Sequence, residues 1–281
     1  MNKNNIKGFQ KNIWIFWSQG WSFAPTLIKD CKDSWVINNP EWDVKTLDSN
    51  SFKEYSDLSF DSNKLKNLSI AHKSDLIRLE LLDKYGGVWV DASLFCLIPL
   101  DNWIFNNLNS GLFFFECGSK CALITNWFIA SKPNHKTIKL IKKELLLFWL
   151  NNNFGRITAG KKFFQKVLTS ILNSNKFTTR FWFNPVVTKI LRIYPYQIFF
   201  FIFDRIIRRK KIHSKVWADT PKISKYICWP FQNSHEPPSN NLKYRVKKTF
   251  VPIIKLNWRD YDIKKNNQNS LINYLNNLIK N

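Results

Sequence analysis

Two aspartates and an arginine between residues 74 and 93 have the types and spacing that could form one charged binding site. Asp75 and Arg78 are three residues apart, so a helix places them on one face. Asp91 follows the short apolar run 88–90, which predicts a strand ending at this aspartate. A carboxylate holds a divalent cation near phosphates or accepts hydrogen bonds from hydroxyls, and a guanidinium donates several hydrogen bonds in one plane. We therefore interpret the three side chains as one site.

The segments around these residues predict how they are positioned. Residues 70–84 have the pattern of a helix whose leucine-rich face packs on a sheet and whose other face carries Asp75 and Arg78. The double glycine at 86–87 allows a sharp turn that residues with a Cβ would resist. The structural alternative is a surface pair between Asp75 and Arg78, with Asp91 capping the next loop. The joint arrangement favours a site.

The beginning of the chain predicts a parallel sheet. Residues 12–17 are short, apolar and β-prone, residues 25–36 have helical spacing, and residues 42–47 predict the next strand. This βαβ order implies that ligands bind at the carboxyl ends of the strands. Asp91 is expected at that edge.

The remaining elements are less regular. We expect a strand at 111–116, a long amphipathic helix at 136–150, a helix at 163–172, a late core element at 250–258 and a helical tail. Residues 49–69 and 232–248 are polar and predict loops, with a short helix in the first. Asn126 and Trp127 are interpreted as the entry to a helix, or as residues that reach the sugar or the acceptor.

The composition is that of a folded domain. The chain has 281 residues, of which 44% are apolar and 16% aromatic, so one large α/β domain can bury a core. Five cysteines include no CxxC pair, which favours free thiols in a reducing cytosol. No signal-peptide core is visible, and no charge-free apolar run reaches the about 20 residues of a membrane-spanning helix.

A net charge of +23 indicates an anionic partner, a coding bias, or both. Lys, Asn, Ile and Phe are all frequent, as an A/T-rich gene would produce. There is no long arginine-rich arm and no zinc-finger spacing, so dedicated nucleic-acid binding is a minority interpretation. We expect part of the charge to assist binding to anionic lipid.

Residues 193–211 combine an aromatic and aliphatic run with a basic run. They are interpreted either as a core strand or as a surface element on anionic lipid, where each basic group adds about 1 kcal/mol. We favour core for residues 193–203 and a membrane-facing basic patch for residues 205–211.

Other chemistries find no support in the sequence. No Ser/His/Asp set has plausible spacing, and His72 is interpreted as a loop or capping residue rather than a base. The GxGxxG and GxxxxGK[ST] motifs are both absent, which argues against standard dinucleotide binding and P-loop chemistry.

The segment from Ser74 to Asp91 resembles the sugar-binding DXD region of glycosyltransferase family 32 and its relatives, specifically the capsular polysaccharide synthesis proteins. Their SDxxRxxxLxxYGGxWxD pattern corresponds here to Ser74, Asp75, Arg78, Leu82, Tyr85, Gly86, Gly87, Trp89 and Asp91. The large clostridial glucosylating toxins share the arrangement of helix, double glycine and acidic strand end. Weaker similarity lies at residues 13–25, 128–135 and 255–259. The resemblance is good over residues 10–150 and thin afterwards.

The resemblance implies a GT-A-like fold, a single Rossmann-type domain over residues 1–281 with a mostly parallel central sheet flanked by helices. Residues 10–150 would bind the nucleotide sugar, and residues 151–281 would form the acceptor side and a tail. The implied catalytic residues are Asp75, Arg78 and Asp91. The implied donor-binding residues are Trp17, Gln19, Gly20, Ser74, Asp75, Arg78, Trp89, Asp91, Ala92, Ser93, Asn126, Lys255 and Trp258.

Ser93 departs from the family pattern. Asp91 stands at the first acid of the DXD motif, and Ser93 occupies the position of the second acid, which commonly binds the metal. By resemblance, Asp91 and Ser93 would hold a divalent cation, Mn²⁺ or Mg²⁺, although serine is a weak neutral ligand. Two alternatives stay open: Asp91 acts through water, or Lys255 and Arg259 neutralise the diphosphate.

By resemblance, the chain is a bacterial glycosyltransferase. It would move a sugar from a nucleotide-diphosphate donor to a growing capsular polysaccharide, exopolysaccharide or O-antigen glycan, with retention of configuration. A lipid-linked acceptor would place it in the cytoplasm, peripheral at the inner face of the cell membrane. The alternatives are a non-enzymatic protein that binds polyanions and a toxin-like enzyme that glycosylates a host protein.

Overall fold

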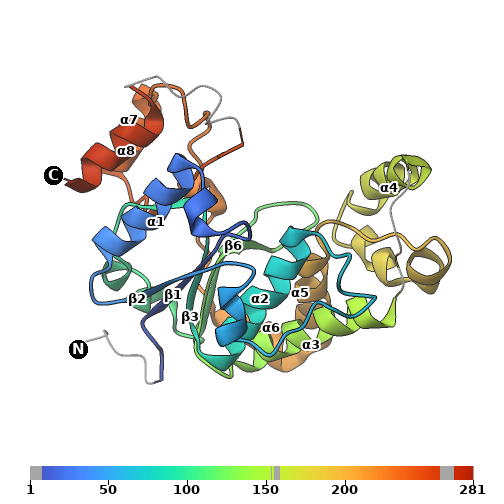
Figure 1. Cartoon of the computed structure of the whole chain (residues 1–281). Coiled ribbons are helices and arrows are strands. Elements are labelled where there is room, and N and C mark those ends of the chain that lie inside the picture. Colours follow the sequence, from blue (N-terminus) through green and yellow to red (C-terminus); the bar gives the residue numbers. More distant parts are fainter. Residues whose placement is uncertain (1–7, 153, 155–158, 260–268, 281) are drawn as a thin grey trace.

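A mixed sheet lies at the centre of the molecule (Figure 1). The computed structural model describes residues 8–152, 154, 159–259 and 269–280. Within them, five strands pair in the order β2-β1-β3-β6-β5. Their bounds are β1 (Asn12–Phe16), β2 (Asp43–Leu47), β3 (Gly87–Asp91), β5 (Leu112–Glu116) and β6 (Ile124–Ser131). β1 is parallel to β2 and β3, whereas β6 runs antiparallel between β3 and β5, so the prediction of a mostly parallel sheet is confirmed.

Helices cover both faces of this sheet (Figure 1). On one face lies α1 (Thr26–Asn38), and α8 (Leu271–Lys280) packs against α1 in the same core. The other face packs against α2 (Ile70–Lys84), α3 (Lys136–Asn151) and α5 (Ile198–Arg209). The other helices of eight or more residues in the described part are α4 (Ala159–Leu172), α6 (Lys211–Asp219) and α7 (Asn240–Lys248). Among the residues that the structure describes, each helix is too short or too polar to span a bilayer.

Strand β1 contributes to both cores because successive side chains of a strand point to opposite faces. Ile13 and Ile15 lie in the core with α1, and Trp14 and Phe16 lie in the core with α2. All four are buried. Burial on both faces explains the continuous apolar run that predicted this strand.

A second, two-stranded sheet joins the late part of the chain to the predicted site. β4 (Leu94–Cys96) pairs antiparallel with β7 (Ile253–Lys255), and Leu94 lies opposite Lys255. The Leu256 amide donates to the Ser93 carbonyl at 2.9 Å. The residues after Asp91 therefore lie beside Lys255, although more than 150 residues separate them in sequence.

The turn from α2 into β3 requires both glycines. Gly86 and Gly87 have φ values of 66° and 96°, a region that residues with a Cβ rarely adopt. A Cβ on Gly86 would lie 2.6 Å from Pro133, and a Cβ on Gly87 would lie 2.4 Å from the Asn12 carbonyl oxygen. Their close packing places β3, and with it Asp91, against β1.

Most predicted elements are present, and three interpretations are wrong. Residues 198–209 form helix α5 instead of a strand, although the predicted burial is correct for much of the run. Residues 240–248 form helix α7 instead of a loop. Asn126 and Trp127 lie inside strand β6 and do not enter a helix.

The basic run 205–211 is only partly a surface patch. Arg205 packs on the ring of Phe183 at 4.7 Å, and Ile206 and Ile207 are buried. Residues 208–211 are exposed, as predicted.

Candidate active site

Helix α2 carries Ser74, Asp75 and Arg78 to the carboxyl edge of the parallel strands. Its first turn is capped by Ser69, whose hydroxyl accepts a hydrogen bond from the His72 amide. The leucine-rich face packs in the core, as predicted. Asp75 and Arg78 are also buried, at 5% and 4% exposure. Buried charges need partners, so the contacts of these two side chains define the site.

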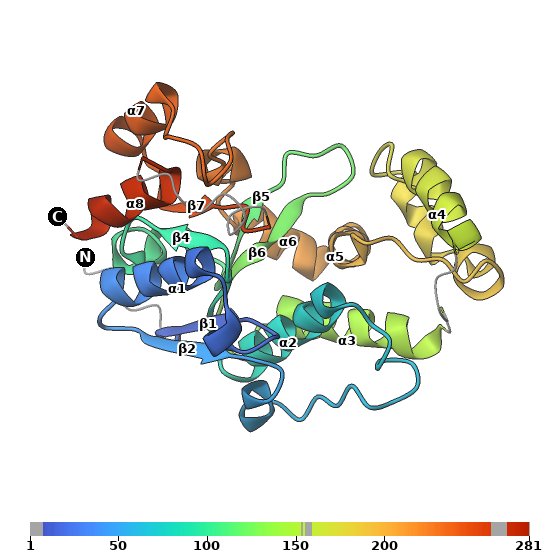
Figure 2. The ribbon, with the colours of Figure 1, turned by 45° about the horizontal axis from the view of Figure 1, so that its top comes forward.

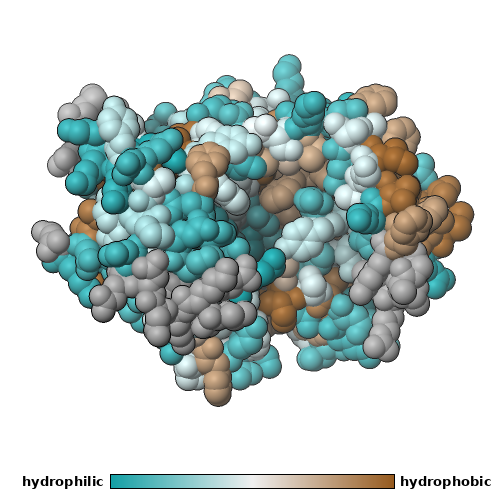
Figure 3. Space-filling model, turned by 90° about the horizontal axis from the view of Figure 1, so that it is seen from above, coloured by the Kyte–Doolittle hydropathy of each residue, from teal (hydrophilic) through white to brown (hydrophobic). Residues whose placement is uncertain are grey.

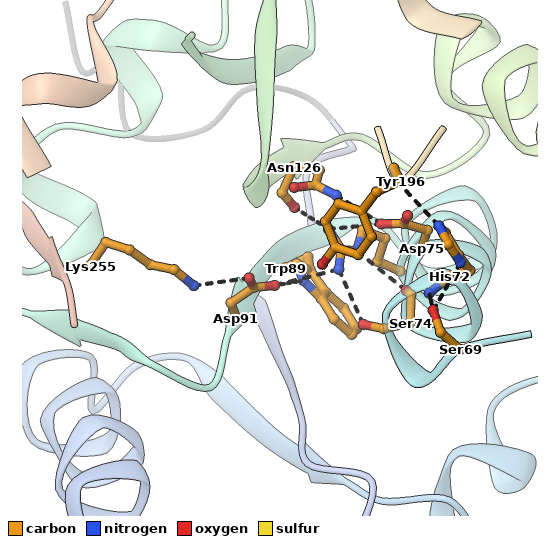
Figure 4. Close-up of polar contacts among 10 residues, drawn as sticks. Ser69, His72, Ser74, Asp75, Trp89, Asp91, Asn126, Tyr196 and Lys255 are labelled. Atoms are coloured by element: carbon orange, nitrogen blue, oxygen red, sulfur yellow. Dashed lines mark hydrogen bonds and ion pairs between the residues drawn. The ribbon is translucent and has the colours of Figure 1, made fainter. Parts of the chain in front are cut away.

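Asn126 on β6 is the partner that the sequence did not place correctly. The side-chain amide of Asn126 donates to Asp75 Oδ1 at 2.8 Å. The backbone carbonyl of Asn126 accepts a hydrogen bond from Arg78 Nη1 at 2.5 Å. Arg78 Nη1 also lies 3.3 Å from Asp75 Oδ1. Its Nη2 donates to Ser74 Oγ at 3.1 Å. Figure 4 shows Ser74, Asp75 and Asn126 grouped beside α2.

Arg78 joins Asp75 to Asp91. Arg78 Nη2 lies 3.5 Å from Asp91 Oδ1, and the guanidinium stacks over the Trp89 ring at 5.0 Å. The Trp89 indole nitrogen donates to the same Asp91 oxygen at 3.2 Å. Trp89 thus supports both partners of the ion pair.

Lys255 holds the other oxygen of Asp91. Its Nζ lies 3.0 Å from Asp91 Oδ2 and donates to Ser93 Oγ at 2.9 Å. Figure 4 shows the lysine reaching Asp91 from the side opposite α2. Charges therefore alternate along one line: Asp75, Arg78, Asp91 and Lys255.

The two carboxylates differ in their pKa values. Burial raises the pKa of Asp75 to about 6, and the opposing effects of Arg78 and Asn126 only reduce this rise. Burial also raises the pKa of Asp91, but Lys255 and Arg78 outweigh that effect and the net shift is downward. Asp91 is therefore ionised at neutral pH, whereas Asp75 can take up a proton in mild acid.

The residues at the DXD position are a poor set for a divalent cation. They offer one carboxylate and one hydroxyl, and both already bind the Lys255 ammonium. Mg²⁺ and Mn²⁺ prefer anionic oxygen ligands. In the described part of the chain, no three acidic, histidine or cysteine side chains come together in a way that would hold a metal.

The charged line forms one wall of a cleft of about 740 Å³. All predicted donor-site residues except Gly20 line the cleft. They are Trp17, Gln19, Ser74, Asp75, Arg78, Trp89, Asp91, Ala92, Ser93, Asn126, Lys255 and Trp258. Gly20 is outside the lining, and its φ of 90° turns the loop that follows Gln19. In the space-filling view, the face is hollowed near its centre (Figure 3).

Two tryptophans from distant parts of the chain meet in this cleft. Trp17 and Trp258 pack edge to face, with ring centroids 5.1 Å apart. The Trp17 indole N–H is buried and has no hydrogen-bond partner among the described residues. The flat apolar surface of these two rings suits a heterocyclic ring.

Four aromatic side chains that the sequence did not assign to the site also line the cleft. They are Tyr196, Phe199, Phe200 and Trp229. The first three belong to the run interpreted as a core strand, so their place at a cleft was missed. Their aromatic density was the available signal, since sugar faces pack on such rings.

His72 acts as a positioning group for Tyr196. A carbonyl oxygen only accepts, so His72 Nε2 donates to the Tyr196 carbonyl at 3.2 Å and Nδ1 accepts from the Ser69 hydroxyl at 2.8 Å. Burial lowers the pKa of His72. The ring is neutral and lies in the first turn of α2, where it holds the Tyr196 carbonyl in place.

Arg259 is the cleft cation with the least compensation. Its side chain is exposed and lines the cleft. Across the described residues, no carboxylate lies within ion-pair distance of it. Arg259 therefore adds a positive charge to the cleft lining.

Comparison with known families gives a match over most of the chain. Residues 1–182 match the family described as capsular polysaccharide synthesis protein. The matched residues include Asp75, Arg78 and Asp91 of the charged line, and Lys255 lies beyond them.

Curated relatives share the same part of the chain. They include the O-glycosyltransferase braB of Annulohypoxylon truncatum, 29% identical over 46% of this chain and 35% of its own length. The glycosyltransferase afumC of Aspergillus fumigatus is 28% identical, over 50% of this chain and 40% of its own length. An uncharacterized glycosyltransferase, L373, of Acanthamoeba polyphaga mimivirus is 28% identical, over 57% of this chain and 64% of its own length. The chain thus matches 35% and 40% of the two fungal relatives.

A search of solved structures finds the PaToxG glycosyltransferase. The alignment covers 85% of this chain and 84% of that chain, at 13% identity and a TM-score of 0.39.

Proposed function

Because the chain belongs to the family of capsular polysaccharide synthesis proteins, we propose that it is a glycosyltransferase that uses a nucleotide-diphosphate sugar. One observation carries the proposal: a line of alternating charges, Asp75, Arg78, Asp91 and Lys255, forms the wall of a cleft large enough for such a donor. The similarity to glycosyltransferases of fungi and a virus supports the reaction class.

The donor lies across this cleft in our proposal. Trp17 and Trp258 bind the base, and Asp75 with Asn126 binds hydroxyl groups of the sugar or ribose. The diphosphate lies near Lys255 and Arg259. This placement follows from the chemistry of each wall: rings for the base, a carboxylate for hydroxyls and cations for phosphate.

Lys255 provides the positive charge at the DXD position in our proposal. Its ammonium binds both Asp91 and Ser93, the two residues that would otherwise hold a metal ion. As the bond between the anomeric carbon and the diphosphate breaks, negative charge develops on the departing oxygen. Lys255 and Arg259 stabilise that charge, and the fixed position of Lys255 avoids reorganisation.

The acceptor hydroxyl attacks the anomeric carbon, and its proton passes to the departing diphosphate. Retention of configuration, implied by the resemblance to family 32, fits a front-face route because Asp91 is engaged by Lys255 and Arg78. We propose a glycan acceptor of the capsular, exopolysaccharide or O-antigen type, carried on lipid. The aromatic wall of Tyr196, Phe199, Phe200 and Trp229 is the proposed acceptor side.

A donor screen with matched variants tests this proposal. Wild type, Asp91→Asn and the control Asp57→Asn, whose side chain is 95% exposed, are compared for thermal stabilisation and hydrolysis across nucleotide sugars. We expect a donor to stabilise wild type and the control, and Asp91→Asn to lose about 100-fold or more in turnover.

Two results would contradict the proposal. One is that no nucleotide sugar binds; the other is that Asp91→Asn transfers sugar like wild type. Steep salt-dependent binding of RNA that is indifferent to Asp91→Asn would instead support a polyanion-binding protein.

A further inference from the structure

Large apolar side chains are exposed on the segment between α3 and α5. We call residues 163–196 the outer lobe; it contains most of α4, the short helical turns η5 (Thr178–Phe183) and η6 (Val186–Ile190), and their connections. Its exposed apolar residues are Phe163, Phe164, Val167, Ile171, Phe177, Phe181, Val186, Ile190 and Tyr196. Phe163 and Ile190 are 71% and 73% exposed. Apolar surface gathers at the right-hand edge of the face in Figure 3, on the side where α4 lies in Figure 1.

The outer lobe has a hydrophobic core of its own, so the exposure of these apolar side chains is not due to a missing core. The inner side of the lobe packs Leu172, Trp182, Val187 and Ile193 against Phe201 of α5. The Trp182 indole donates to Asn173 at 2.8 Å. The exposed residues are additional to this cluster, so the outer side presents apolar surface from a folded unit.

The same lobe carries only positive charge. Lys166, Lys176, Arg180, Lys189 and Arg192 are exposed on it. Residues 145–203 contain no aspartate or glutamate. Apolar side chains mixed with lysine and arginine, without acids, are complementary to the headgroups and outer acyl region of an anionic bilayer.

The lobe leads directly to the cleft. Tyr196 is both an exposed residue of the lobe and part of the cleft lining, and Gln197 and Phe200 continue that lining on the entry to α5. Figure 1 and Figure 2 show α4 at the opposite end of the molecule from α7 and α8. A surface that rests on the lobe would therefore meet the aromatic side of the cleft.

We propose that the outer lobe docks the protein on an anionic lipid bilayer. The aromatic and aliphatic side chains enter the interface while the basic groups bind the headgroups. The exposed part of the basic run, from Arg208 on, adjoins the lobe, because Arg208 Nη1 donates to the Lys176 carbonyl at 2.6 Å. The main docking surface thus lies at residues 163–196, earlier in the chain than the basic run 205–211 that the sequence assigned to the membrane.

A bilayer fits this lobe better than a second copy of the chain. Two such lobes face to face would bring ten exposed cations together without any acid, twice the five named above. The docking itself does not depend on the proposed transfer. The further step, in which a lipid-linked acceptor reaches the cleft at Tyr196, rests on the proposed function.

Vesicle co-sedimentation of the full chain tests the docking. Phosphatidylcholine vesicles with and without phosphatidylglycerol are used with wild type, Phe163→Asp/Ile190→Asp, and the control Tyr244→Asp on α7, whose side chain is 64% exposed. We expect wild type and the control to bind anionic vesicles, and the double variant to bind at least about tenfold more weakly. Thermal unfolding and binding of the donor without vesicles should be the same in all three proteins.

The outcomes separate the two proposals. Wild type that stays in solution with anionic vesicles, or a double variant that binds them like wild type, overturns the docking proposal. Dimerisation in sedimentation velocity that the double variant abolishes, without vesicle binding, would assign the lobe to a second copy. Donor binding that fails in wild type concerns the proposed function alone.

Discussion

Arg78 connects two carboxylates with different tasks. It contacts Asp75 and Asp91 within 3.5 Å and is itself buried. Removing Arg78 would leave both carboxylates without this partner, whereas Arg78 keeps Asp91 as a partner when Asp75 loses its charge. Single substitutions in this line are therefore expected to affect more than the residue that is changed, and variants that keep shape but change charge are the most informative.

Substitution of Lys255 tests whether this lysine or a divalent metal ion supplies the positive charge beside Asp91 and Ser93. We expect chelation by EDTA to change wild-type transfer by less than about twofold, and Lys255→Ala to lose about 100-fold or more, because one stabiliser of the departing diphosphate is removed. Mn²⁺ or Mg²⁺ should restore part of the loss, since Asp91 and Ser93 become accessible oxygen ligands. Transfer rates with and without added metal are the measurement.

Lys11→Ala is the matched control for that comparison. Lys11 also forms an ion pair, with Asp101 at 2.8 Å, but outside the cleft. Its transfer rate should match wild type. If wild type itself requires Mn²⁺ after EDTA treatment, Lys255 is not the resident cation.

Asp75 makes stability and donor binding respond to pH in opposite ways. Its folded pKa of about 6 lies above the value near 3.9 of an unfolded aspartate, so the folded state holds the proton more tightly. Stability from Asp75 is therefore full below about pH 4 and is lost as pH rises through 6. In the proposed function Asp75 accepts hydrogen bonds from the donor as a carboxylate, so donor binding should weaken as pH falls through 6.

Asp75→Asn separates these two effects. We expect it to raise the free energy of unfolding at pH 7.5 by about 1–3 kcal/mol, because it removes a buried charge, and to raise it less at pH 5. Donor affinity should fall and lose its pH dependence near 6. Urea unfolding and donor titration at both pH values are the measurements, and an equal gain at pH 5 and 7.5 would contradict the assignment.

At the scale of elements, the turn between α2 and β3 sets the position of Asp91. α2 supplies Asp75 and Arg78, and β3 supplies Asp91, so the turn fixes the distance between the two halves of the line. The antiparallel pairing of β4 with β7 then brings the Lys255 side chain to Asp91. Each of these strands is short, so the positions of Asp91 and Lys255 depend on how the elements pack together.

Gly87→Ala tests that turn. The added Cβ would meet backbone of β1 at 2.4 Å, so we expect a loss of more than about 2 kcal/mol in the free energy of unfolding. Gly8→Ala is the control, because Gly8 has a similar φ of +84° and nothing within 4 Å of the added Cβ. Urea unfolding of both variants isolates the steric contact; equal losses would show that φ strain alone matters.

Helix α5 shows where element prediction failed. Its residues 198–203 are aromatic and β-branched, which favours a strand by local preference. In the structure the run is buried from several sides, with Phe199 in the core of α2 and Phe201 in the core of the outer lobe. The helical period becomes visible only when the run is continued through the arginines of residues 205–209, which the sequence pattern assigns to a separate basic patch.

At the scale of the molecule, charge and apolar surface are distributed unevenly. The net charge is +23, yet the charges of Asp75, Arg78, Asp91 and Lys255 balance one another. The excess includes the exposed cations of the outer lobe. This separation agrees with the two proposals, in which the cleft binds a donor by specific contacts and the outer lobe binds lipid by general attraction.

The sequence by itself determined the first half of the site. Asp75, Arg78 and Asp91 could be assigned because helix periodicity, a double glycine and a buried strand are local signals, and a parallel sheet places strand ends at one edge. Only the tertiary structure decided that Asn126 joins Asp75, that Lys255 occupies the space between Asp91 and Ser93, and that Trp258 meets Trp17. Those contacts link residues 51 to 241 positions apart and depend on strand pairing and core packing, which no local pattern encodes.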